Sequence, residues 1–103
     1  MKMEINYREA LKNFLDKDGK LRQFPRKRKH RNIVYFFLAS KFETGKKYTE
    51  KEVNEILNEY HTFNDCCMLR REMYDRRFFG RKNDGSEYWL EENQPDYNAE
   101  ITK

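Results

Sequence analysis

Long apolar runs, a leader segment and spaced cysteine pairs are all missing from this sequence. Its longest apolar run covers residues 33–39, far short of the ~20 residues that cross a bilayer. Charged residues such as Glu4 and Arg8 occupy the N-terminal stretch, where a secretory signal would be apolar. The two cysteines, Cys66 and Cys67, are adjacent, and a disulfide between neighbours closes almost no loop. We therefore expect a cytoplasmic chain with reduced thiols and no membrane partner.

Residues for catalysis or metal binding are also scarce. Two histidines are present, and the adjacent cysteines lack the spacing of metal ligands. The four glycines are isolated, so there is no glycine-rich phosphate loop, and no general base is placed beside Cys67. We expect no enzyme, no metal site and no cofactor. His30 should lie at the edge of the core, and His61 should follow a helix end, where a cation suits the helix dipole.

What the chain has instead is charge together with aromatic side chains. Charged residues make up 39% of its 103 residues and the mean hydropathy is −1.22, values that suggest disorder. Aromatic residues reach 16%, however, and disordered chains are poor in them. The length suits one core and not two. We therefore expect a single small domain with an aromatic-rich core inside a charged shell.

Positive charge is concentrated in two blocks. Seven cations and no anion lie between Lys20 and Arg31, and residues 65–82 carry a smaller basic excess. The segment between the blocks, 48–64, and the C-terminal segment, 83–103, are acidic. Such asymmetry indicates the kind of partner and says nothing of the fold.

Apolar residues recur at helical spacing in four segments. The predicted helices are 3–15, 25–42, 50–60 and 64–77. Gly19 suits the C-terminal exit of the first helix, and Pro25 suits the first position of the second. Thr49 starts a T-x-x-E capping box before the third helix, and Asn64 or Asp65 should cap the fourth.

Helical wheels predict which side chains of these segments are buried. In the second helix the buried stripe is Val34, Phe37 and Leu38. In the fourth helix the inner face is Cys66, Leu69 and Met73, and the outward-facing residues are Asn64, Cys67, Met68, Arg71, Tyr74 and Asp75.

A hairpin is predicted after the fourth helix. Asp84-Gly85, flanked by strand formers, indicates a two-residue type I′ turn. The implied pairs are Phe79–Leu90, Gly80–Trp89, Arg81–Tyr88, Lys82–Glu87 and Asn83–Ser86. This register places opposite charges across from each other and a tryptophan over a glycine.

The order of these elements predicts an α+β, mostly helical fold. A helix, a short turn, a second helix and a hairpin form the layout of a winged helix-turn-helix, with the two-stranded C-terminal hairpin as the wing. Residues 1–19 would form an extra N-terminal helix, 20–91 the winged-helix-like domain, and 92–103 an acidic flexible tail.

A basic surface on such a fold indicates contact with nucleic acid. The candidate binding residues are Arg26, Lys27, Arg28, Lys29, Arg31, Asn64, Met68, Arg70, Arg71, Arg81 and Lys82. We expect the basic run at 26–31 to hold backbone phosphates, while Asn64, Met68 and Arg71 would read bases of double-stranded DNA. If so, the basic run, the fourth helix and the hairpin should share one face.

Two other interpretations stay open. Arginines on a small helix are often only a solvated face, and Arg71 lies one turn from Asp75, with which it can pair. The same fold also occurs in modules that bind a protein partner or RNA. The sequence does not decide between a monomer and a homodimer, nor does it name a regulatory protein partner.

Four segments resemble one bacterial family, the domain of unknown function 2087 (DUF2087). They are DGKLRQFPRKRKHR, KFETGKKYTEKEVNEIL, LRREM and DGSEYW, and the resemblance covers residues 18–90. It implies a transcriptional regulator whose basic segment, helix motif and wing lie at 25–31, 69–72 and 84–89. The family tends to have a glycine near the end of the second paired helix, where this chain has Arg76-Arg77. No catalytic residue follows from the resemblance.

Overall fold

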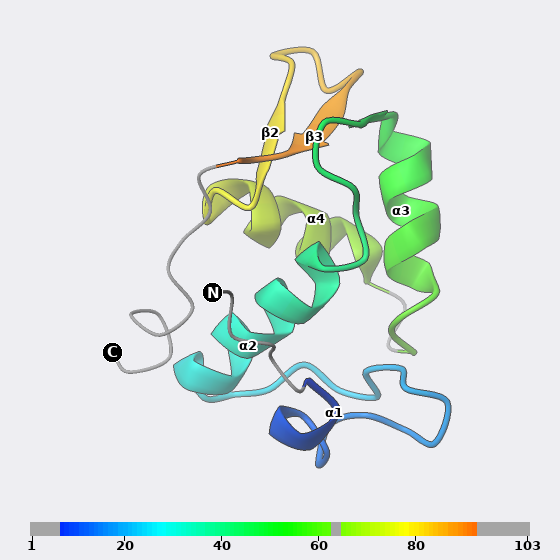
Figure 1. Cartoon of the computed structure of the whole chain (residues 1–103), viewed down its shortest axis with the longest axis vertical. Coiled ribbons are helices and arrows are strands. Elements are labelled where there is room, and N and C mark those ends of the chain that lie inside the picture. Colours follow the sequence, from blue (N-terminus) through cyan, green and yellow to red (C-terminus); the bar gives the residue numbers. More distant parts are fainter. Residues whose placement is uncertain (1–6, 63–64, 93–103) are drawn as a thin grey trace.

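The computed structural model describes residues 7–62 and 65–92 of the chain. Within them, one short helix and three helices of 9–12 residues accompany a three-stranded antiparallel sheet (Figure 1). The elements are α1 (Tyr7–Ala10), α2 (Arg28–Ala39), β1 (Lys47–Tyr48), α3 (Glu50–Asn58), α4 (Cys66–Asp75), β2 (Phe79–Arg81) and β3 (Tyr88–Leu90). The predicted α+β, mostly helical class is confirmed.

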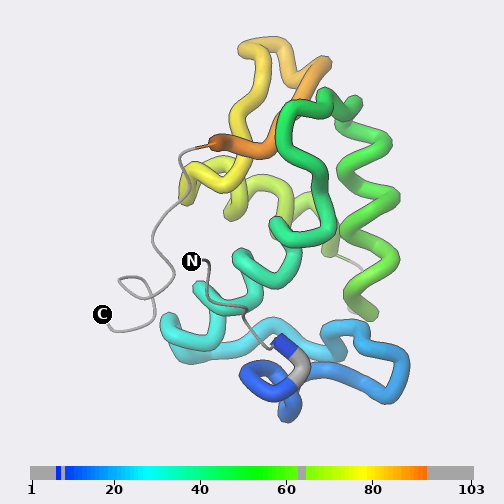
Figure 2. Tube along the Cα trace, viewed as in Figure 1, coloured from blue at the N-terminus to red at the C-terminus, as the bar shows by residue number. Residues whose placement is uncertain are grey.

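The second half of α2 runs through the middle of the molecule. Residues 32–39 are all buried, where the sequence predicted one buried stripe. The Phe36 ring lies 4.8 Å from that of Phe78, and the Phe37 ring lies 6.2 Å from that of Tyr60. Figure 2 shows α2 at the centre, with α1 at its base and α3, α4 and the hairpin beyond it. Because this half is covered on all sides, its hydrophobic pattern has no polar face to mark a stripe.

The beginning of α2 is later than the sequence predicts. Pro25 is not its first residue, because the helix starts at Arg28 after the extended N-cap residue Lys27 (ψ 135°). The Arg31 Nε donates to the Pro25 carbonyl oxygen at 2.7 Å, and the Arg31 guanidinium carbon lies 5.0 Å from the Phe24 ring centre. These contacts hold the preceding segment against the first turn of α2. Only part of the basic run is therefore helical.

The N-terminal helix is shorter than predicted. α1 ends at Ala10, and an antiparallel bridge between Leu15 and Leu21 follows it. The Asp16 carboxylate holds the intervening loop by accepting two backbone N–H groups, both at 2.9 Å. Gly19 has φ +80° in this loop, so it serves a reversal of the chain and not the end of a helix. The first residues of the predicted helix lie outside the described residues.

α3 and α4 are joined by a short turn, and both helices begin with a side-chain cap. The predicted capping box is confirmed: Thr49 Oγ1 accepts the Glu52 N–H at 3.1 Å, and Glu52 Oε1 accepts the Thr49 N–H at 2.9 Å. At the start of α4, Asp65 Oδ1 accepts the Met68 N–H at 3.2 Å. Asp65 is thus the cap, while the other candidate, Asn64, lies outside the described residues.

His61 fixes the geometry of this turn. Its side chain is buried, with Nδ1 2.8 Å from the Leu57 carbonyl oxygen and Nε2 accepting the Asp65 N–H at 3.1 Å. Since Nε2 accepts a hydrogen bond, the proton sits on Nδ1 and the imidazole is neutral. Burial also lowers the pKa of His61. The cation expected here from the sequence is corrected to a neutral ring, because the side chain is buried and its Nε2 must accept the Asp65 N–H.

α4 ends in a Schellman motif that has an arginine at the position favouring glycine. The Phe78 N–H donates to the Met73 carbonyl oxygen at 2.8 Å, and the Arg77 N–H to the Tyr74 carbonyl oxygen at 3.1 Å, the two bonds of that motif. Arg77 has a φ of 68°, the single left-handed non-glycine residue in the described part of the chain. The helix therefore ends with the geometry that usually requires glycine, and the residue in the left-handed conformation is an arginine, which is strained there.

The hairpin register is as predicted, and the sheet has a third strand that the sequence did not reveal. The confirmed pairs of β2 and β3 are Phe79–Leu90, Gly80–Trp89 and Arg81–Tyr88. β1 lies on the other edge of β3, with Lys47 opposite Trp89, which gives the strand order β1-β3-β2. The inward-facing Tyr48 and Tyr88 are both buried, so the sheet adds its aromatic rings to the core.

The turn of the hairpin differs from the prediction. Gly85 has φ +75° but Asp84 does not have a positive φ, and a type I′ turn needs both. The Lys82 N–H donates to the Glu87 carbonyl oxygen and the Gly85 N–H to the Lys82 carbonyl oxygen, both at 2.9 Å. Residues 83–86 therefore form a longer loop, in which the predicted Asn83–Ser86 pair does not occur.

Candidate nucleic-acid interface

The outward side of α4 is short and polar. Arg71 has 84% of its side chain exposed, and its Nε lies 3.9 Å from Asp75 Oδ2. Cys67 and Tyr74 are exposed too, as the helical wheel predicted. Met68 instead packs half-buried against the core, so its predicted outward position is wrong. Its flexible thioether chain lies at the edge of the polar side, from where it can fold back onto apolar neighbours.

The end of α4 and the hairpin enclose a shallow hollow of ≈ 620 Å³. The lining residues that matter are Tyr74, Asp75, Arg77, Arg81, Trp89 and Glu91. The Arg81 guanidinium carbon lies 4.8 Å from the Tyr74 ring centre, a cation–π contact. A hydrogen bond with Tyr74 raises the pKa of Arg81. We call this the hairpin hollow; it brings two arginines beside two aromatic rings.

Arg70, a predicted contact, does not reach this surface. Its side chain is only 15% exposed, and Nη2 lies 2.9 Å from Glu50 Oε1. Its Nη1 also donates to Asn54, and its guanidinium carbon lies 5.9 Å from the Tyr88 ring centre. Arg70 therefore joins α4 to α3 and to β3, and its charge is used inside the protein.

Arg76 is likewise used internally. Its Nε lies 3.3 Å from Glu72 Oε2, which also accepts the Tyr35 hydroxyl at 3.1 Å. The Arg76 guanidinium carbon is 5.2 Å from the Tyr35 ring centre. Burial, with Glu72 beside it, raises the pKa of Tyr35 to about 12. This network fixes α4 on α2 and leaves Arg71 and Arg77 as the exposed arginines of this region.

Lys82, the other predicted contact of the hairpin, shares a carboxylate. Its Nζ and that of Lys47 both lie 3.6 Å from Glu87 Oε2. The side chains of Lys82 and Lys47 remain 59% and 68% exposed. One carboxylate between two cations leaves a net positive charge where these three side chains meet.

The predicted basic run lies before and within the first turn of α2. Arg26, Lys27, Arg28 and Lys29 are exposed, and none of them is within ion-pair distance of a carboxylate of the described residues. A second hollow, of ≈ 390 Å³, lies beside them with the rings of Phe14, Phe24 and His30 in its lining. The rings of Phe14 and His30 are 5.1 Å apart, which agrees with His30 at the edge of the core.

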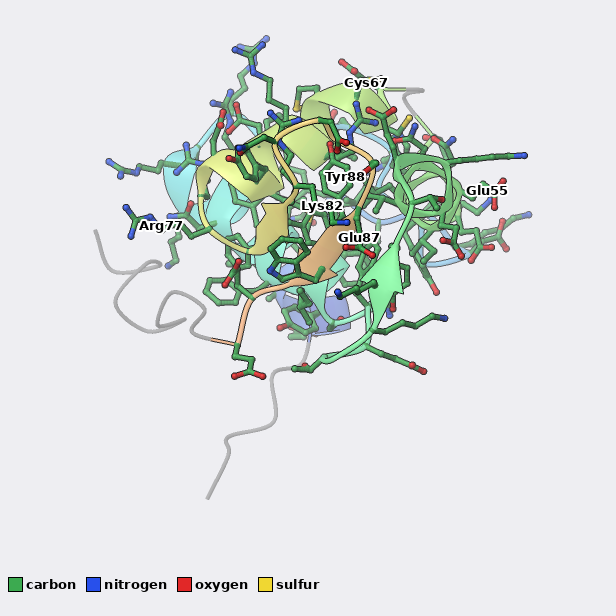
Figure 3. All side chains as sticks on the ribbon, turned by 90° about the horizontal axis from the view of Figure 1, so that it is seen from above. Glu55, Cys67, Arg77, Lys82, Glu87 and Tyr88 are labelled. Carbon is green, nitrogen blue, oxygen red and sulfur yellow. The ribbon has the colours of Figure 1, made fainter. Side chains whose placement is uncertain are left out.

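These groups do not form one patch, so the expectation that the basic run, the fourth helix and the hairpin share one face is wrong (Figure 1). In Figure 1, the start of α2 lies beside α1, toward the end of the molecule opposite to the β2–β3 loop, with α4 between them. Figure 3, seen from the hairpin end, shows Arg77 at one edge and Glu55 of the acidic α3 at the opposite edge. α4 and the hairpin thus offer one cationic surface, the start of α2 offers a second, and α3 lies on the far side from Arg77.

The segment from the basic run to β3 also matches a known protein family. Residues 20–90 match the family described as an uncharacterized protein conserved in bacteria, DUF2087. The chain belongs to the DUF2087 family. The DUF2087 match contains α2, α3, α4 and all three strands, and α1 precedes it. No curated protein and no solved structure matches the chain.

Other kinds of site have little support in the described residues of this DUF2087 protein. No group of three or more His, Cys, Asp or Glu side chains there could hold a metal ion. No helix of the described part is long and apolar enough to cross a membrane. Burial raises the pKa of the Cys66 thiol, which keeps it protonated and weakly nucleophilic.

Three residues of the hairpin hollow were missed by the sequence reasoning. Arg76 and Arg77 have the same side chain, but Arg76 pairs with Glu72 whereas Arg77 is exposed and has a left-handed backbone conformation. Glu91 follows the last strand and was predicted to be the last residue of the winged-helix-like domain, with no role of its own. Trp89 gave a signal, since its predicted place opposite Gly80 already put the ring on one face of the hairpin.

Proposed function

We propose that this DUF2087 protein is a DNA-binding transcriptional regulator with a winged-helix domain. The order helix, strand, helix, helix and hairpin, with the first strand paired to the last, is compatible with a winged-helix domain. In such a domain α4 would enter the major groove of duplex DNA, and the β2–β3 hairpin would act as the wing. The start of α2 would bind the DNA backbone.

The observation that carries this proposal is the exposure of Arg71, Arg77 and Arg81 on α4 and the hairpin, with Arg77 on the side opposite to Glu55 of the acidic α3 (Figure 3). Guanidinium groups bind phosphates and guanine edges through two parallel hydrogen bonds. The pair between Arg71 and Asp75 is exposed and long, so it contributes little and a phosphate can displace it. Asn64 and Lys82 stay predicted contacts. Met68 and Arg70 are the weaker ones, because Met68 packs half-buried against the core and the charge of Arg70 is already paired.

The basic run supports the same proposal from a second side. The start of α2 has no side-chain cap and no acidic residue in its first turn. Cations there lie near the positive end of the helix dipole, which destabilises a helix that meets only water. A backbone phosphate would accept the first N–H groups and neutralise the cations together. Because this run lies away from the hairpin, it would contact DNA beyond the stretch held by α4.

Fluorescence anisotropy with labelled duplex DNA, at several salt concentrations, tests the proposal. Arg71→Ala and Arg81→Ala should each weaken binding and reduce the log–log salt slope by about 0.9 for each phosphate that is no longer neutralised. Lys51→Ala is the matched control, since Lys51 is an exposed cation on α3, and it should leave both quantities unchanged. Absence of binding at about 50 mM salt, with a protein partner co-purifying in fixed ratio, would favour a protein-binding module instead.

A further inference from the structure

We infer that Trp89 is a stacking platform for an unpaired nucleobase whose phosphates bind the cations beside it. The inference rests on the proposed function for the class of partner, nucleic acid, and goes beyond it in the form of that partner. Duplex DNA keeps its bases stacked on one another, so only an unpaired nucleotide can offer a base face to an indole.

The position of Trp89 in the sheet carries the first step. β3 is the middle strand, and Trp89 lies directly opposite Lys47 of β1 and Gly80 of β2. Its neighbours Tyr88 and Leu90 are buried, so Trp89, by strand alternation, lies on the outer face of the sheet. A half-buried aromatic ring therefore lies on the outer face of the middle strand.

Gly80 and Glu91 hold the indole in one orientation. A Cβ atom at Gly80 would lie 2.3 Å from Trp89 Nε1 and 2.5 Å from Cε2, so the ring rests on the backbone where no side chain intervenes. The indole N–H donates to Glu91 Oε1 at 3.0 Å. A ring fixed in this way loses little conformational freedom when a base stacks on it.

Cations lie on both sides of the ring. Trp89 lines the hairpin hollow, which is also lined by Arg77 and Arg81. It also lines a third hollow, of ≈ 420 Å³, whose charged lining residues are Lys46, Lys47, Glu91 and Glu92. The linings of the two hollows thus bring cationic side chains to both sides of Trp89, where they can bind the phosphates of a nucleotide stacked on the indole.

The chemistry of these hollows fits a nucleotide better than an apolar ligand. Aromatic stacking tolerates every base because each has a π face, and arginines and lysines bind the backbone. The carboxylates of Asp75 and Glu91, in the same lining, can accept hydrogen bonds from exocyclic amino groups of a base. The competing interpretation is that Trp89 only covers the glycine of the opposite strand, as aromatic rings do in many sheets.

Free nucleotides share this chemistry with single strands, so the experiment includes both. Trp89 is the single tryptophan of the chain, and its fluorescence therefore reports on the platform alone. The full chain is titrated with an oligothymidylate of about 10 nucleotides, with thymidine monophosphate, and with a blunt duplex. We expect saturable quenching, and protection from acrylamide, with the oligonucleotide and little change with the duplex. Equal quenching by the mononucleotide would assign the platform to a free nucleotide.

Variants of Trp89 distinguish a role in stacking a base from a role in covering Gly80. With labelled oligothymidylate, Trp89→Leu should weaken binding about tenfold or more, which is the effect of removing an aromatic side chain on which one base stacks. Trp89→Phe should keep most of the affinity. Arg77→Gln and Lys47→Gln should each reduce the salt slope by about 0.7 per phosphate contact, and Lys51→Gln should not.

Two results would overturn the inference: oligonucleotide binding that leaves Trp89 fluorescence and acrylamide access unchanged, or no binding of oligonucleotide and mononucleotide alike. If circular dichroism shows that Trp89→Leu does not fold, the fluorescence quenching of the unmodified chain and the affinity of the Trp89→Phe variant still test whether a base stacks on Trp89. Duplex binding without quenching would retain the proposed function and reject the platform, so the two failures are distinguishable.

Discussion

Arg77 is the clearest place where one residue should limit the stability of this fold. It occupies the left-handed position after α4 with a φ of 68°, where an L-residue is destabilised by about 1–2 kcal/mol through the clash between Cβ and the carbonyl oxygen. Glycine removes that clash but costs about 0.5–1 kcal/mol in backbone entropy. We therefore expect Arg77→Gly to raise the free energy of unfolding by about 0.5–1 kcal/mol.

The Schellman bonds should survive this change. The N–H groups of residue 77 and of Phe78 donate to the carbonyl oxygens of Tyr74 and Met73, and they remain when the side chain is removed. Phe78 and Met73 are both buried, so the apolar contact that accompanies the motif is kept. The stabilisation should appear as a melting temperature raised by about 2–8 °C.

Urea unfolding followed by Trp89 fluorescence and by circular dichroism measures the effect. The midpoint should rise with the slope unchanged. Arg77→Ala is the control for the removed charge, because it keeps a Cβ at the same φ and should not stabilise. Arg76→Gly should destabilise by about 1 kcal/mol or more, since it removes the ion pair with Glu72 in the helix cap. If Arg77→Gly left the midpoint unchanged or lowered it, the strain argument would be wrong.

Three further predictions concern a histidine, a glycine and the basic run. Burial lowers the folded-state pKa of His61, so its contribution to stability is fully present above about pH 6.5 and is lost as the pH falls. The urea midpoint should therefore be higher at about pH 8 than at about pH 5. The variant His61→Gln should remove most of this difference. Gly80→Ala puts a Cβ 2.3 Å from Trp89 Nε1 and should cost about 1–3 kcal/mol; an unchanged tryptophan emission spectrum would contradict this. Arg26→Ala combined with Arg28→Ala should lower the salt slope of duplex binding by about 1.8, and an unchanged slope would reject the phosphate clamp.

The parts of the fold that the sequence predicted are those set by neighbouring residues. The capping box at Thr49 depends on backbone groups three residues away. The pairing of Gly80 with Trp89 follows from alternation on both sides of a short loop. Each signal lies within one element or one hairpin, so no long-range contact was needed to identify it.

The parts that failed depend on contacts between distant segments. β1 has two residues, too few for any alternating pattern, and exists because β3 offers it a free edge. Pro25 was predicted inside α2 from its own preference, but the contact from Arg31 holds it outside. The start of α2 is decided by this packing and not by local propensity.

The candidate surface shows the same division. Arg70 and Arg71 are neighbours with one side-chain type, and both were predicted contacts, although the helical wheel placed only Arg71 on the outward face. Packing separates them, because α3 and β3 meet one side of α4 and engage Arg70 through Glu50, while Arg71 stays exposed. The helical wheel suggested this division, but it could not name Glu50 and Asn54 as the partners of Arg70, because these residues lie on another helix.

Residue-level mapping of duplex DNA on the chain tests the central claim most directly. The measurement is the change in backbone amide chemical shifts of the ¹⁵N-labelled protein as duplex DNA is added. The proposed winged-helix mode predicts that the largest changes lie in α4 around Arg71, in β2 around Arg81 and at the start of α2. The amides of the acidic α3, from Glu50 to Asn58, should change least. Changes concentrated in α3, or none at saturating DNA, would contradict the account.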